Sequence, residues 1–179
     1  MRVWRYLPLS VGKDAIDYVK YSILSGTAKN ARFVIKGDLF DLPYDKTKNG
    51  TFKIETKVEN AVMAYVPKQL QDPKDLVWPS FSNLSGDLIF DGAGMEVRQA
   101  KAVITNNQSL KITDANVKIT DLSKTVVQVK AQATGPLAAM LSFTNNSPLR
   151  DITENALLHT KASGNSDYIF NMNLPIAQM

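Results

Sequence analysis

The sequence contains no cysteine and a single histidine, His159, among its 179 residues. Without cysteine, the chain forms no disulfide, no thiol nucleophile and no cysteine-ligated zinc or iron–sulfur site. A metal site with two histidines from one chain is excluded as well. The chain also lacks an apolar run of about 18 residues, as a transmembrane helix needs, and an apolar core typical of a signal peptide. These absences exclude several classes of enzyme and metalloprotein.

The sequence also lacks a strong excess of positive or negative charge. Lysine and arginine total 21 against 17 aspartates and glutamates, which gives a net charge of +4. The basic residues are scattered singly, whereas nucleic acids and anionic lipid surfaces are bound by basic clusters. We therefore expect no nucleic-acid partner. With 44% hydrophobic and 21% charged residues, the composition is that of an ordered globular protein.

Chemical motifs are missing too. The sequence has no phosphate-binding loop, dinucleotide fingerprint or nucleophile elbow. Asp38, Asp41 and Asp45 are close in sequence and His159 is near serine residues, but no spacing specifies acid–base catalysis or a triad. Asp45 begins a run that resembles a calcium loop, yet Thr56 stands where the bidentate glutamate is required. We expect no enzyme activity, no catalytic residue, no metal site and no cofactor.

The sequence is rich in hydrophobic periodicity. Apolar residues from Val11 to Leu24 recur at helical spacing and Gly26 follows them, which predicts one amphipathic N-terminal helix. After Gly26 the period changes to two, which predicts strands. The expected strands cover residues 33–35, 51–58, 61–66, 84–90, 95–104, 110–120, 125–134, 155–162 and 167–176. About nine strands with turn residues and no helices between them predict a mainly β protein, an antiparallel β meander.

The alternation also predicts that the sheet has one apolar and one polar face. We expect the inner, apolar face to carry Phe52, Ile54, Val58, Leu88, Phe90, Val97, Ile112, Val117, Ile119, Val127, Val129, Phe170 and Met172. With one helix, the sheet must cover this face by curling on itself, by packing against the helix or by binding an apolar ligand. For each of these residues an ordinary closed core is the alternative to a binding surface.

Short motifs dispersed along the chain carry a family resemblance. They are Arg5-Tyr6-Leu7-Pro8, the helix that ends at Gly26, Leu42-Pro43-Tyr44, Gly50-x-Phe52, Trp78-Pro79-x-x-x-Asn83-Leu84, Ala115-Asn116-Val117 and Ser147-Pro148-Leu149. Together they resemble the AsmA-like proteins of Gram-negative bacteria. Within that family the chain is most similar to the central region of the very long YhdP-type members, a domain of unknown function.

This resemblance implies a curved, taco-like β-sheet with an open apolar groove along its length. It implies a bacterial bridge-like lipid-transfer protein that an N-terminal helix holds in the inner membrane. Such proteins project through the periplasm, move phospholipid to the outer membrane and maintain its barrier. On this basis we expect residues 1–179 to form a single groove segment of a much longer periplasmic chain, whose membrane anchor lies outside this sequence.

The partners that the resemblance implies are phospholipid acyl chains, flanking repeats of the same long chain and envelope proteins. Two other functions are compatible with the residues. One is a structural or interaction β module of an envelope protein, with a closed core and no lipid. The other is a hydrolase around His159, which would require a serine and an aspartate to converge on it in space.

Overall fold

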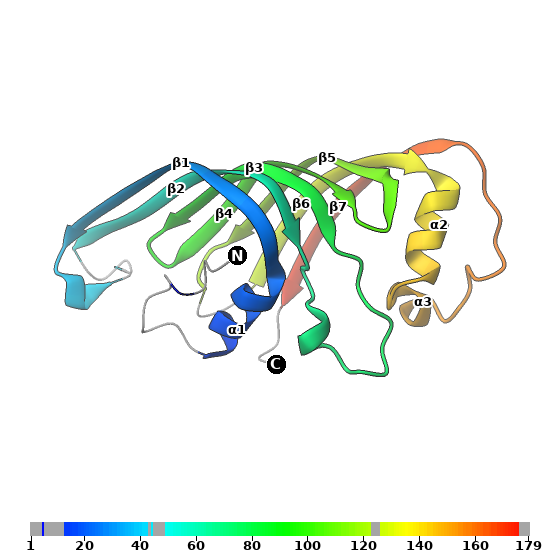
Figure 1. The fold of residues 1–179 in the computed structure, drawn as a ribbon, viewed down its shortest axis with the longest axis horizontal. Coiled ribbons are helices and arrows are strands. Elements are labelled where there is room, and N and C mark those ends of the chain that lie inside the picture. The colour runs from blue at the N-terminus through cyan, green and yellow to red at the C-terminus, as the bar shows by residue number, and fades with distance from the viewer. Residues whose placement is uncertain (1–4, 6–12, 43, 45–48, 123–125, 176–179) are drawn as a thin grey trace.

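One antiparallel sheet dominates the computed structural model, which describes residues 5, 13–42, 44, 49–122 and 126–175. Its seven strands follow one another in the sheet in the same order as in the chain (Figure 1). They are β1 (Ile23–Gly37), β2 (Gly50–Met63), β3 (Phe81–Asp91), β4 (Gly94–Ile104), β5 (Asn107–Ile119), β6 (Val126–Pro136) and β7 (Asn165–Pro175). The sheet is arched and does not close, because β1 and β7 lie at opposite edges.

Helices lie on one side of this sheet. The described residues form three α-helices, α1 (Lys13–Ser22), α2 (Leu137–Asn145) and α3 (Leu149–Ile152), and two 3-10 helices, η2 (Leu39–Asp41) and η3 (Lys68–Leu70). In Figure 1, α1, the connection between β2 and β3, α2 and α3 all lie beneath the arch, on its concave side. None of these helices has the length and hydropathy that crossing a bilayer requires.

The structure confirms the predicted fold class, a mainly β, curved antiparallel meander with a helix at its start. The predicted helix was too long, because α1 ends at Ser22 and Ile23 already pairs with Met63 of β2. Cross-strand pairing outweighs the helical spacing of Ile23 and Leu24. The strands predicted at 51–58 and 61–66 belong to one strand, because Asn60 forms a bulge within β2 and not a turn. This strand ends at Met63, so the predicted end at residue 66 was too late.

The region between β6 and β7 contradicts the sequence prediction. Residues 155–162 are not a strand but a series of turns, in which the Leu158 and Thr160 N–H groups donate to carbonyls three residues earlier. The helix α2 was missed, because most residues of Leu137–Asn145 are apolar and leave no one-sided stripe to detect. The sheet therefore has seven strands and not nine, among the residues described.

A line of β-bulges crosses the first four strands. Asn30, Asn60, Asn83 and Gln99 all have φ between 50° and 54°, and each coincides with a shift in pairing register. Asparagine adopts this left-handed conformation more readily than most residues do. Because a bulge bends its strand and increases its twist, this bulge line contributes to the curvature of the arch.

The pairing register places apolar and polar residues on opposite faces. One row of directly paired residues crosses all seven strands: Phe33, Ile54, Phe90, Met95, Ile119, Val127 and Leu174. The adjacent row, one residue along each strand, is Arg32, Glu55, Ile89, Glu96, Lys118, Gln128 and Asn173. Successive side chains on a strand point to opposite faces, so the first row belongs to an apolar face and the second to a mainly polar one.

A candidate binding face on the concave side of the sheet

The apolar face is the concave one. Phe81 belongs to this face, since it pairs with Ile104, and the Tyr65 ring stacks on the Phe81 ring with centroids 4.8 Å apart. The Tyr18 hydroxyl of α1 donates to the Tyr65 carbonyl at 3.0 Å, which ties the helix to this side. Burial raises the pKa values of both phenols. Because α1 lies beneath the arch in Figure 1, the apolar side chains face the same hollow.

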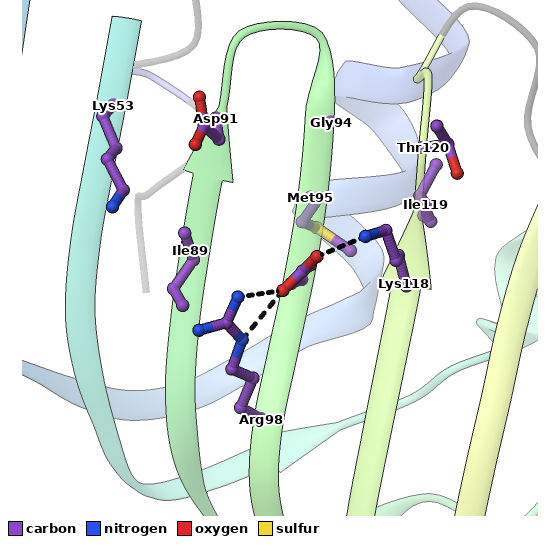
Figure 2. A pocket seen from close by; sticks show the side chains of 10 residues that line it. Lys53, Ile89, Asp91, Gly94, Met95, Arg98, Lys118, Ile119 and Thr120 are labelled. Atoms are coloured by element: carbon purple, nitrogen blue, oxygen red, sulfur yellow. Dashed lines mark hydrogen bonds and ion pairs between the residues drawn. The ribbon is translucent and has the colours of Figure 1, made fainter.

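Figure 2 gives the same result from the convex side. Arg98 and Lys118 project from the near face of the sheet, and the faint blue helix α1 lies behind the strands. This convex face has a hollow of about 270 Å³ lined by charged residues. Glu96 accepts hydrogen bonds from Lys118 and Arg98, and both lower the pKa of its carboxyl. Glu96 therefore pairs with two of the cations that line the hollow, and such surface ion pairs contribute little to stability.

Two apolar rows run side by side across the concave face and are here called the open rows. The first is the Phe33–Leu174 row described above. The second consists of Thr56, Leu88, Val97, Val117, Val129 and Met172, directly paired from β2 to β7. Neither row contains a charged residue. The one polar group, the Thr56 hydroxyl, is satisfied because it donates to the Lys29 carbonyl at 3.0 Å.

Side chains of the open rows are large and incompletely covered. At the sheet edges the exposed fractions are 65% for Phe33, 45% for Leu174 and 38% for Met172. Most of the side chains between them are half-buried. A contiguous apolar surface that remains exposed on a folded chain is typical of a binding site.

A second part of the concave face, nearer α2, is closed. Its buried members include the large side chains of Ile104 and Leu110 and five alanines that form what we call the alanine patch: Ala61, Ala100, Ala102, Ala115 and Ala133, each 4–8% exposed. Gly86 lies within contact of this patch, and a Cβ atom there would lie 3.0 Å from the Ala100 Cα. Backbones therefore approach closely here, and the patch is packed like a protein core.

All thirteen residues that the alternation assigned to the inner face lie on the concave side. Nine belong to the open rows. Phe52 lies beside the first row, two residues before Ile54 on β2, and pairs with Ile35 of β1. The other three, Val58, Ile112 and Phe170, lie toward the alanine patch. That these residues contact lipid stays a prediction. Sequence reasoning missed Phe33, Met95 and Leu174, although Met95 continues the alternation of Val97 and Leu174 that of Met172.

The groups weighed for catalysis do not converge. His159 is exposed in the turns between α3 and β7, not in a strand as the sequence predicted. Asp38 caps η2, since its carboxylate accepts the Phe40 N–H at 3.0 Å, while Asp45 lies outside the described residues. Among the described residues, no three histidine, aspartate or glutamate side chains gather around a possible metal position. The concave face is therefore the feature of this structure that is best suited to bind a ligand.

Comparison with known proteins gives two matches and one negative result. The family model described as "YhdP protein" matches residues 1–179. Over 176 residues the chain is 27% identical to the intermembrane phospholipid transporter YhdP of Escherichia coli (strain K12). That match covers 98% of this chain and 13% of the relative, so the chain spans a small part of the relative's length. No solved structure matches the chain.

Proposed function

Because the chain belongs to the YhdP protein family, we propose that its concave face binds phospholipid acyl chains. In this proposal, residues 1–179 are one stretch of a periplasmic bridge along which phospholipid moves between the inner and outer membranes. Acyl chains slide passively along the open rows, and no residue of the chain acts as a catalyst. A part of the protein outside this sequence anchors the bridge in the inner membrane, and the transport maintains the outer-membrane barrier.

The absence of charge from the open rows carries the proposal. Hydrocarbon needs no hydrogen bonds, and each CH₂ group that leaves water contributes roughly 0.8 kcal/mol. The rows cross the strands, and six strand spacings of about 4.8 Å extend for roughly 29 Å. Similar apolar residues at each strand give a lipid similar contacts at each step, so no position holds it much more tightly than the next.

The two sheet edges support continuation into neighbouring segments. No described strand pairs with the outer side of β1 or β7, and each edge therefore offers backbone N–H and C=O groups to another strand. The first open row ends at both edges on exposed apolar residues, Phe33 and Leu174. In the proposal, flanking repeats of the same long chain pair with these edges and extend the apolar rows. Envelope proteins are the other class of partner.

One observation favours the alternative function, a structural module with a closed core. The alanine patch is buried, so in that part of the concave face no room for lipid is evident. The two proposed functions therefore differ only in what covers the open rows. If those rows are filled by protein in the working assembly, the module is structural; if they contact lipid, it is a transport segment.

Photo-crosslinking at neighbouring residues tests the proposal. Phe90 lies on the concave face and Ile89 on the convex face, and both are half-buried apolar residues of β3. We expect benzoylphenylalanine at position 90 to form an adduct with radiolabelled phospholipid and the same group at position 89 to form little. Native mass spectrometry of the chain after expression in bacteria, before and after delipidation, measures bound lipid independently. Equal labelling at both positions, or none at Phe90, would contradict the proposal.

A further inference from the structure

A cavity of about 370 Å³ opens beside α2, apart from the open rows. Its walls come from three parts of the chain: residues 77–80, the turn between β4 and β5, and the second half of α2. In Figure 1 these segments lie at the end of the sheet that carries α2 and α3. On β4, the buried Ala100 and Ala102 separate Val97 of the open rows from Ile104, which lines the cavity. The volume is within the range of roughly 300–1,000 Å³ that is typical of small-molecule sites.

Hydrogen bonds hold the three walls of this cavity in place. The Asn107 side-chain amide donates to the Ala139 carbonyl of α2 at 2.8 Å, and its oxygen accepts the Ser109 hydroxyl at 2.7 Å. The Thr105 N–H donates to the Ser80 carbonyl at 2.9 Å, which joins the turn between β4 and β5 to the segment before β3. The walls are therefore set before a ligand arrives, as is usual for small-molecule sites.

Other polar groups of the lining remain available to a ligand. The Asn106 side-chain amide makes no hydrogen bond with any described residue. The Asn146 side-chain nitrogen donates to the Ser142 carbonyl at 2.8 Å and to the Ser142 hydroxyl oxygen at 3.2 Å. Within the described part of the chain, this leaves the Asn146 amide oxygen without a donor and the Ser142 hydroxyl hydrogen without an acceptor. The cavity therefore offers uncharged donors and uncharged acceptors together.

Aromatic and aliphatic side chains supply the rest of the lining. Trp78, Phe143, Val77 and Pro79 contribute apolar surface beside the free polar groups. The Trp78 ring is held in position, because it contacts the Tyr65 ring edge-on with centroids 5.8 Å apart. The negative face of an aromatic ring attracts C–H groups. A sugar ring matches this mixture, since it has a face of C–H groups and a rim of hydroxyls that both donate and accept.

The same lining disfavours other classes of ligand. No described residue that lines the cavity is charged, so an anion would lose its hydration without gaining a counter-charge. Hydrocarbon would cover the free polar groups without pairing them. An extended peptide has no strand edge to pair with, because β4 and β5 each have a neighbouring strand on both sides. We propose that this cavity binds a neutral saccharide, with its rings against the aromatic side chains and its hydroxyls bonded to Asn106, Ser142 and Asn146. The inference does not depend on lipid at the open rows.

Isothermal titration calorimetry of the 179-residue chain tests this assignment. The probes are three uncharged trisaccharides, maltotriose, cellotriose and triacetylchitotriose, which differ in linkage and in acetylation. An uncharged peptide, N-acetyl-trialanine amide, is the comparison. We expect at least one trisaccharide to bind with saturation and the peptide not to bind. Binding of none of the three trisaccharides, or of the peptide alone, would overturn the assignment.

Two pairs of variants place the binding in the cavity. Ser142 lines it, whereas Ala138 lies one turn earlier on α2 outside the lining, and both are exposed. Ser142→Phe should abolish saccharide binding and Ala138→Phe should preserve it. Asn106→Ala should weaken binding roughly three- to tenfold, as the loss of one hydrogen bond does, and Gln108→Ala, outside the lining, should not.

Circular dichroism verifies that all four variants fold. If Ser142→Phe binds the saccharide as tightly as Ala138→Phe does, the cavity assignment is overturned. Photo-crosslinking of phospholipid at Phe90, measured on the same two variants, should be equal. This measurement separates a failure of the saccharide site from a failure of the proposed function, because the two sites lie apart on the sheet.

Discussion

The two parts of the concave face differ in the size of their side chains and in how well they are covered. The open rows carry phenylalanine, isoleucine, leucine, methionine and valine, most of them half-buried, whereas the alanine patch carries methyl groups that are 4–8% exposed. Both arise from the same apolar–polar alternation along the same strands. Alternation therefore selects the face, but side-chain size alone does not decide its coverage, because Ile104, Leu110 and the open-row residue Ile119 are also buried.

Close backbone approach explains the buried part. A Cβ atom on Gly26 would lie 2.7 Å from the Ala61 Cβ, and one on Gly86 would lie 3.2 Å from the Ala100 Cβ. Glycine next to alanine therefore lets neighbouring strands pack without a gap, and this part needs no ligand to fill it. Beside the open rows, a Cβ atom on Gly94 would lie 3.2 Å from the Ile119 carbonyl oxygen, but no glycine of the described residues approaches an open-row side chain. There, a hydrocarbon guest can supply the missing packing.

The largest effect should come from enlarging a residue of the alanine patch. Ala100→Leu adds bulk where the backbone of Gly86 is already close, and overpacking of this kind costs about 3 kcal/mol. The matched change Val97→Leu, on the same strand in the open rows, should cost less than about 1 kcal/mol. Urea denaturation measures both free energies of unfolding. Equal losses for the two variants would remove the distinction between closed and open parts.

A charge in the open rows should have the next largest effect, on lipid binding. Val129→Glu places a carboxylate on the concave face, and we expect capture of radiolabelled phospholipid to fall at least about tenfold, which corresponds to about 1.4 kcal/mol. The control is Gln128→Glu, one residue earlier on the convex face, where Lys118 lies directly opposite on β5. Circular dichroism verifies that both variants fold. Undiminished capture by Val129→Glu would mean that lipid binds elsewhere.

The bulge line can be tested at Asn83. This residue has φ 50° in β3, so the β-branched variant Asn83→Val should lower the free energy of unfolding by about 1–2 kcal/mol. Asn83→Gly should cost less, because glycine adopts this conformation without strain. The midpoint of thermal unfolding measures both. If the valine and glycine variants lose the same stability, the left-handed backbone conformation at Asn83 does not determine the cost of substitution.

The smallest effect on stability should come from a residue of the convex face, which lies outside both the open rows and the alanine patch. Hydrogen bonds from Lys118 and Arg98 hold the pKa of Glu96 below its ordinary value of 4.5. The carboxylate therefore stabilises the fold above about pH 4.5, and this contribution is lost as the pH falls through the lowered pKa. The difference in unfolding temperature between the native chain and Glu96→Gln should shrink across that range, and added salt should reduce it. If the unfolding temperatures of the native chain and Glu96→Gln still differ equally at lower pH, the stabilisation does not come from the ionised Glu96 carboxylate.

Local patterns predicted most of the sheet but little of what surrounds it. Strands β4, β5 and β6 agree with the prediction to within three residues at each end, because alternation depends only on neighbouring residues. The helix α2 was missed, because an apolar segment without a stripe resembles a buried strand as much as a helix. The cavity beside α2 could not be predicted, because it joins Trp78 to Phe143 across 65 positions of sequence.

Between the bulges, the sequence by itself determined which side chains share a face and that this face is free of charge, because an unbroken strand places alternate residues on opposite sides. Across a bulge the pairing decided it, since Val97 and Ala100 share the concave face although they are three residues apart. Only the tertiary structure decided where that face is closed and where it stays open. Bulges at Asn30, Asn60, Asn83 and Gln99 accompany the bend of the sheet, and α1 and α2 lie against its concave side. Coverage depends on which distant segments reach a given row, and that is set by the packing of the whole chain.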